Sequence, residues 1–105
     1  EESGVKGRRR LMFGGHIMVS LAIDSRGQLV GSVQMAIEGL PEVEDDDESI
    51  ADLVRRTITG TLKSIPPKRR GDLELVNTAL QRAVRSEVAN YWGKKPNVAV
   101  FVHGV

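Results

Sequence analysis

The sequence predicts an α+β domain with the element order ββααβ, in which two helices pack on one face of a three-stranded mixed sheet. Three short segments, residues 16–24, 29–38 and 97–103, alternate apolar and polar residues with period two, which is typical of strands. Between the second and third of these segments, two longer ones repeat apolar residues at helical spacing. A chain of 105 residues, 40% of them hydrophobic, is long enough to bury one core around these elements.

The first two strands are predicted to form an antiparallel hairpin. In the first strand, alternate residues place one apolar set on a single side: Ile17, Val19, Leu21 and Ile23. Residues 25–28, Ser-Arg-Gly-Gln, form a turn in which the glycine is free to take a positive φ. In the second strand the corresponding set is Leu29, Val33, Met35 and Ile37.

Both predicted helices have recognisable ends. Asp47 or Ser49 is the candidate N-cap of the first helix, because either side chain can accept a hydrogen bond from a free backbone N–H. Pro66 begins a Pro-Pro pair that ends the helical pattern. Asp72 is the candidate cap of the second helix, and Gly93 is placed to terminate it.

The order of the strands follows from the path of the chain. A helical hairpin brings the chain back, so the third strand can lie parallel beside the first or antiparallel beside the second. The first strand is the most uniformly apolar of the three, which favours the centre of the sheet for it. Both helices then cover the same face.

The face of the sheet without helices is predicted to be apolar. Its residues are small or apolar, where a water-facing sheet prefers charged side chains. They are Met18, Ser20, Ala22, Val30, Ala36, Ala99 and Phe101. We expect another protein surface to pack there, either a second copy of the chain or a neighbouring domain.

Composition excludes some functions. The chain has no cysteine, which excludes disulfides, a thiolate nucleophile and zinc fingers with sulfur ligands. Its net charge of +1 is unevenly distributed. Residues 1–53 carry 5 basic and 11 acidic residues, whereas residues 54–105 carry 10 and 3. The two halves can attract each other, and the basic half can attract RNA without reading its sequence.

No segment predicts contact with a membrane. No apolar run approaches the ~20 residues that a membrane-spanning helix needs, and the amino end lacks the pattern of a signal peptide. Together with the lack of cysteine, this favours the cytoplasm as the location.

The candidate metal and catalytic residues are few. His16 and His103 are the two histidines, and with Asp24 they show no spacing typical of a zinc site. The acidic residues 42–48 lack the spaced ligands and the glycine of a calcium loop, so they predict a solvated loop before a helix. Ser20 lies within a strand and belongs to no nucleophile elbow. We therefore predict no catalytic residue, no metal ligand and no cofactor in this chain.

Basic residues are the candidates for contact with RNA phosphates. Those predicted to make auxiliary phosphate contacts are Arg8, Arg9, Arg10, Lys68, Arg69 and Arg70. Stacking aromatics are scarce, with only Tyr91 and Trp92 adjacent on the second helix, so sequence-specific reading of RNA is not indicated.

The motifs taken together resemble a known family. These are RRRLMFGGHIMVSLAIDSRGQLVG at residues 8–31, an IEGLPE loop, IPPKRR between the helices, and GKKPNVAVFVHGV at the end. They resemble the carboxy-terminal domain of bacterial ribonuclease J, although Gly15 and His16 stand where that family has Asn-Gly. The resemblance covers residues 8–105, and it divides the chain into a linker from a preceding domain, residues 1–10, and the domain itself, residues 11–105.

The resemblance implies a function for the parent protein. It implies a metallo-β-lactamase-fold nuclease with an inserted β-CASP domain, in which two zinc ions hydrolyse RNA, as a 5′-to-3′ exonuclease and sometimes an endonuclease, in mRNA decay and rRNA maturation. The family's His-x-His-x-Asp-His zinc motif has no match in this chain. The carboxy-terminal domain is implicated in forming dimers and supporting the nuclease, and Arg8 to Phe13 then form the joint to the enzyme's body.

Two hypotheses follow. The first is an accessory domain of a ribonuclease J that pairs with a second copy and with the nuclease and β-CASP domains of its own chain, and that meets RNA through the full-length enzyme. The second is a small RNA-binding module whose basic helices hold phosphates.

Overall fold

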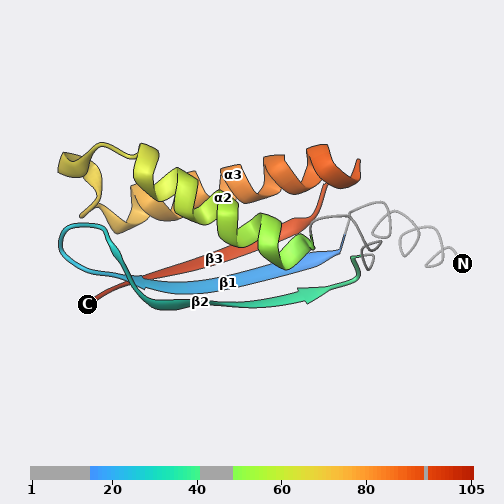
Figure 1. Ribbon diagram of the computed structural model, residues 1–105, viewed down its shortest axis with the longest axis horizontal. Helices are drawn as coiled ribbons and strands as arrows, with labels where there is room; N and C mark the ends of the chain where they lie inside the picture. The colour runs from blue at the N-terminus through green and yellow to red at the C-terminus, as the bar shows by residue number, and fades with distance from the viewer. Residues whose placement is uncertain (1–14, 41–48, 94) are drawn as a thin grey trace, which may run out of the picture.

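The computed structural model describes residues 15–40, 49–93 and 95–105, which form a three-stranded sheet and a layer of two helices (Figure 1). In chain order the elements are β1 (His16–Ile23), β2 (Leu29–Glu38), α2 (Ile50–Ser64), the short 3-10 helix η1 (Pro67–Arg69), α3 (Leu73–Trp92) and β3 (Asn97–Gly104). Both α-helices lie on the same side of the sheet (Figure 1). The predicted α+β class and the order ββααβ are confirmed.

The sheet has the strand order β2-β1-β3, with β1 in the centre as predicted. β1 pairs antiparallel with β2 and parallel with β3. Parallel neighbours need a long crossover, and the helical hairpin of α2 and α3 supplies it. Because β1 has a strand on each side and helices above it, Ile17 and Ile23 lose all contact with solvent.

Helix α2 begins and ends where the sequence predicts. The Oγ of Ser49 accepts a hydrogen bond from the N–H of Asp52 at 3.0 Å, so Ser49 is the N-cap, as one of the two alternatives proposed. Asp47, the other alternative, lies outside the described residues. At the other end, the N–H of Ile65 bonds back to the carbonyl of Thr61 at 3.2 Å, and Pro66 prevents a further turn.

Helix α3 also has the predicted caps. Asp72 Oδ1 accepts a hydrogen bond from the N–H of Leu75 at 3.1 Å, which satisfies one of the free donors of the first turn. Gly93 ends the helix in the left-handed conformation, with φ of 88°, which a residue without Cβ adopts without strain.

The core lies between the helix layer and the covered face of the sheet. Its buried hydrophobic residues are all aliphatic, as the 4% aromatic content requires. Each helix contributes a fully buried stripe, including Val54 and Ile58 from α2 and Leu80 and Val84 from α3. Burying one such side chain stabilises the fold by about 1.5–3 kcal/mol relative to leaving it in water.

The hairpin of β1 and β2 contains an irregularity that the sequence does not predict. Ser20 pairs with Gln34, whereas Ala22 pairs with Val30, so the strand β2 has two residues more than β1 between these pairs. Gly31 lies in this bulge with φ of +73°. Because the insertion is even in number, the alternation of faces continues past it. Leu29 pairs with Ile23 and therefore lies on the predicted side of the sheet, which the helices cover. At the corner of the sheet it is nevertheless 37% exposed.

Among the described residues, neither α2 nor α3 has an apolar stretch of the length that a bilayer crossing demands.

Candidate association surface

The face of the sheet opposite the helices carries all seven residues predicted for it. Directly paired residues of neighbouring strands point to the same side, so the register gives the rows of this face. The rows are Ala36–Met18–Ala99, Gln34–Ser20–Phe101 and Val30–Ala22–His103. We use the term open face for the set Met18, Ser20, Ala22, Val30, Ala36, Ala99 and Phe101.

The open face exposes large apolar side chains. Phe101 is 55% exposed, and Met18 and Val30 are each 44% exposed. A shallow hollow of about 270 Å³ lies beside Phe101, between it and Met18 and Ala36. Exposed hydrophobic side chains that gather on one face are a feature of surfaces that bind other proteins. Such side chains are typical of a surface that packs against another protein or domain.

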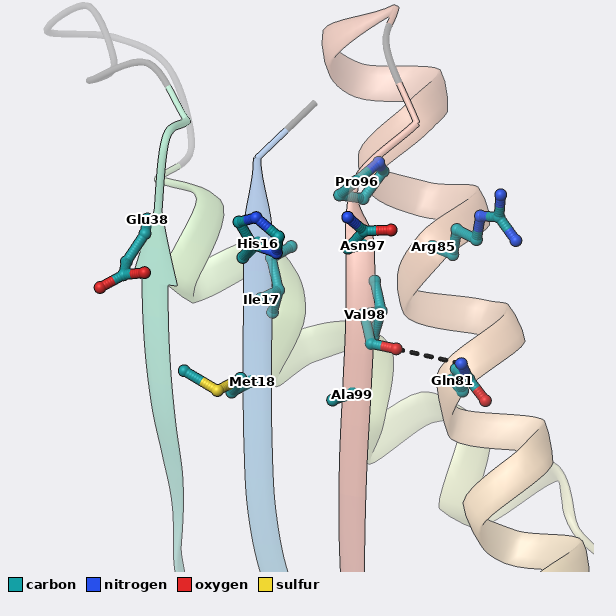
Figure 2. Close-up of a pocket in the computed structure, with 10 residues that line it drawn as sticks. All are labelled: His16, Ile17, Met18, Glu38, Gln81, Arg85, Pro96, Asn97, Val98 and Ala99. Atoms are coloured by element: carbon teal, nitrogen blue, oxygen red, sulfur yellow. Dashed lines mark hydrogen bonds between the residues drawn. The ribbon is translucent and has the colours of Figure 1, made fainter. Parts of the chain in front are cut away.

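Polar side chains border the open face and also enter it. At the end where β1 begins, Glu38, His16 and Asn97 form one row across the three strands (Figure 2). They line a second hollow of about 500 Å³, which also includes Met18 and the side of α3 (Figure 2). Gln34 lies in the middle row, where the sequence analysis did not include it. The face is thus an apolar centre with a polar rim, the composition of many protein interfaces.

A side chain of α3 satisfies a backbone group on the outer edge of β3. Gln81 on α3 donates a hydrogen bond from Nε2 to the carbonyl of Val98 at 3.0 Å (Figure 2). This side chain therefore satisfies an acceptor on the outer edge of β3, which hinders another strand from pairing there.

A close crossing of two glycines lies at the end where β1 begins. A Cβ on Gly15 would lie 2.5 Å from the carbonyl oxygen of Glu38, and one on Gly39 would lie 3.2 Å from Gly15 Cα. Both glycines have a positive φ, of 79° and 75°. The sequence analysis did not single out Gly39, although an isolated glycine after an alternating segment is a signal for such a bend.

The basic residues have two different environments. Lys68 and Arg69 lie exposed on η1. Arg70 instead donates from Nε to the carbonyl of Ile65 at 2.9 Å and from Nη2 to that of Lys63 at 3.2 Å. It therefore caps the carboxyl end of α2, a structural role that the sequence analysis missed. Residues 8–10 lie outside the described residues, so their predicted phosphate contacts, like those of Lys68 and Arg69, stay predictions.

The described residues contain no group of three or more side chains that could hold a metal ion. His16 and His103 are paired in register with Asn97 and Ala22, so they lie six residues apart along the sheet, about 20 Å at the rise of a strand. They cannot bind one ion together. A zinc site therefore does not fit the described part of this chain.

One carboxylate has a distinct environment, at the turn between β1 and β2. Asp24 Oδ1 accepts hydrogen bonds from the N–H of Gln28 at 3.0 Å and of Arg26 at 2.8 Å. These bonds, with the one from Gln28 the largest cause, lower the pKa of Asp24 below its ordinary value of 3.8. The charged carboxylate thus fixes the turn, and we assign it no part in a reaction.

Comparison with known proteins identifies the family. Residues 4–105 match the family described as "Ribonuclease J C-terminal domain". The chain belongs to this family. It is also 42% identical over 102 residues to "Ribonuclease J" of Sinorhizobium meliloti, a match that covers 97% of this chain. The resemblance inferred from the motifs of the sequence is confirmed.

The chain spans 18% of the length of that relative. A ribonuclease J homologue of this kind is therefore a larger protein with several domains, of which the present chain corresponds to the carboxy-terminal one. The predicted boundary between a linker and a domain at residue 11 lies outside the described residues and stays a prediction.

Proposed function

We propose that this chain is a non-catalytic association domain of a ribonuclease J, and that its open face packs against a second copy to form a homodimer. The observation that supports this most is that Met18, Val30 and Phe101, one on each strand, are exposed on the sheet face that neither α2 nor α3 covers. Apolar area in water favours association, by roughly 25 cal/mol for each Å² removed from solvent. Two identical faces meeting across a two-fold axis is the commonest way in which soluble chains pair.

The proposal extends to the rest of the parent protein. The parent is a zinc-dependent ribonuclease of the metallo-β-lactamase and β-CASP type, acting in mRNA decay and rRNA maturation in the cytoplasm. We expect the zinc ions of the parent protein to be held by its nuclease domain. The nuclease and β-CASP domains of the same parent protein are further partners, and they contact this domain at the end where β1 begins.

Sedimentation of the 105-residue chain over a range of concentrations tests the homodimer. We expect a concentration-dependent dimer for the wild type and a monomer for Phe101→Asp, because a charge in the centre of the apolar contact remains without a partner. The matched control is Leu73→Asp, which places the same charge on an exposed hydrophobic residue of the helix layer, 38% exposed. The control is expected to remain a dimer.

Cross-linking tests which surface makes the contact. The chain has no cysteine, so one introduced thiol labels one position. Stacked sheets lie about 10 Å apart, so a bis-maleimide of about that span should join two copies of Ser20→Cys, which lies in the central row. Ser86→Cys, on the exposed side of α3, should not be joined. A monomeric wild type, or equal cross-linking of both variants, would contradict the proposal.

A further inference from the structure

A second surface lies at the opposite end of the domain from the start of β1. Five cations from neighbouring segments gather there, and we name the group the distal cap. It consists of Arg26, Lys63, Lys68, Arg69 and Arg70. The turn between β1 and β2 and the connection between α2 and α3 lie together at this end of the molecule (Figure 1).

Close contacts hold these segments together. A Cβ on Gly27 would lie 2.1 Å from the Cβ of Arg70, so the hairpin turn rests directly on that residue. The same arginine is bonded to the carbonyls of Ile65 and Lys63 at the end of α2. Arg70 thus links the turn that carries Arg26 to the helix end that carries Lys63. The cluster follows from the packing of the fold rather than from one flexible segment.

Three carboxylates follow or precede the cations of the distal cap closely in the chain, Asp24, Asp72 and Glu74, and they offset only part of its five positive charges. Asp24 accepts hydrogen bonds from backbone N–H groups of its own turn, and Asp72 caps α3. Within the described residues the ion pair that is formed, between Arg55 and Asp52 at 3.8 Å, belongs to the first turns of α2 and not to the cap. The cap therefore has an excess of positive charge.

A structural explanation accounts for only part of this charge. Cations are favourable at the carboxyl end of a helix, and Arg70 and Lys63 lie at the end of α2. Arg26 lies on a hairpin turn, and Lys68 and Arg69 lie on η1 with no side-chain hydrogen bond or ion pair to another described residue. These three donors are available to a ligand.

We propose that the distal cap binds the phosphate backbone of single-stranded RNA. Lys and Arg on exposed turns contact phosphate oxygens without needing an apolar pocket. Among the described aromatic residues, Tyr91 and Trp92 lie at the far end of α3 and Phe101 lies on the open face. None of these three is placed to stack a base beside the cap, so the binding is not expected to depend on sequence. The relative from Sinorhizobium meliloti is a ribonuclease by name, which favours RNA over an acidic protein as the polyanion.

Titration of a fluorescein-labelled RNA of about 20 nucleotides of mixed sequence, followed by anisotropy at about 50 and about 200 mM salt, tests the site. If about four phosphates are neutralised, the dissociation constant should rise about 50-fold between these salt concentrations. The triple variant Arg26→Gln/Lys68→Gln/Arg69→Gln should bind about 10-fold more weakly at low salt. Its log–log salt slope should be less steep by about 2, as expected for three lost contacts. Arg70 is left in place because it stabilises the fold.

The matched control removes the same charge elsewhere. Arg55→Gln/Arg82→Gln/Arg85→Gln changes three exposed arginines of the helices and should leave the salt slope unchanged. Equal losses in both triple variants would mean that only net charge matters, and an absence of RNA binding by the wild type would overturn the proposal outright. Tighter binding of a fluorescein-labelled poly-glutamate of equal length would assign the cap to an acidic protein instead. Circular dichroism verifies that both variants are folded.

Discussion

The contact between Gly27 and Arg70 predicts a strong coupling between the hairpin turn and the end of α2. Gly27 has φ of +77°, and an alanine there costs about 1–2 kcal/mol from the left-handed backbone alone. Its Cβ would also lie 2.1 Å from that of Arg70, so the arginine must move. Moving it breaks hydrogen bonds to Ile65 and Lys63, at a further cost of about 1–3 kcal/mol. We expect Gly27→Ala to lower the free energy of unfolding by about 2–5 kcal/mol.

Two further variants separate the backbone strain from the clash. Gly31→Ala is the matched control, because Gly31 has a similar φ of +73° but nothing within 4 Å of an added Cβ. Gly31→Ala should lower the free energy of unfolding only by the backbone strain, about 1–2 kcal/mol. Arg70→Gly removes the atoms in the way, so Gly27→Ala made in that background should also cost only about 1–2 kcal/mol.

Urea unfolding followed by the fluorescence of Trp92, the single tryptophan, measures each free energy. The double-mutant cycle should therefore give a coupling of about 1–3 kcal/mol between positions 27 and 70. Additive effects of Gly27→Ala and Arg70→Gly, or a cost for Gly31→Ala equal to that for Gly27→Ala, would refute the steric reasoning.

Two other predictions concern stability. The pKa of Asp24 is lowered in the folded chain, so its carboxylate stabilises the fold above its ordinary pKa of 3.8, and this contribution is lost as the pH falls through the lowered value. Asp24→Asn should therefore unfold more readily than the wild type at neutral pH but not in acid, as urea unfolding at several pH values will measure; a difference independent of pH would contradict this. Gly60 lies inside α2 with nothing within 4 Å of an added Cβ, so Gly60→Ala should raise the free energy of unfolding by about 0.5–1 kcal/mol. Thermal unfolding measures the midpoint, which should rise for Gly60→Ala and fall for Ile58→Ala, a truncation of a buried side chain that serves as the control.

Much of the fold was predictable from the sequence because local signals and burial agree. The alternation in β1 and the stripes of α2 and α3 each describe a single apolar side, and a layer of helices on one face of a sheet buries all of them. The helix ends were predictable since Ser49, Asp72 and Gly93 satisfy backbone groups within their own turns. The residues of the open face follow from the same alternation, because they lie on the face of the sheet that does not pack against the helices.

The features that sequence analysis missed depend on contacts that the local sequence pattern does not reveal. The extra residues of β2 around Gly31 leave the period of two intact, so no pattern reveals them. Arg70 belongs to a run of three basic residues, and nothing in that run shows that its guanidinium reaches the carbonyls of α2 while Arg69 stays exposed. The crossing of Gly15 and Gly39 joins the two ends of a hairpin, which only the register brings together.

The two proposed surfaces can act at the same time. In a pair of sheets stacked through their open faces, the helix layers lie on the outside, and the distal cap, formed by the hairpin turn and the connection between the helices, stays accessible in each copy. A dimer then presents two caps to one RNA strand, and the second contact forms at a raised effective concentration. Phe101→Asp should therefore leave the affinity of a single cap unchanged and remove only the gain from two. If that substitution instead lowered the affinity of a single cap itself, the open face would take part in RNA binding, and the open face and the distal cap would no longer be separate sites.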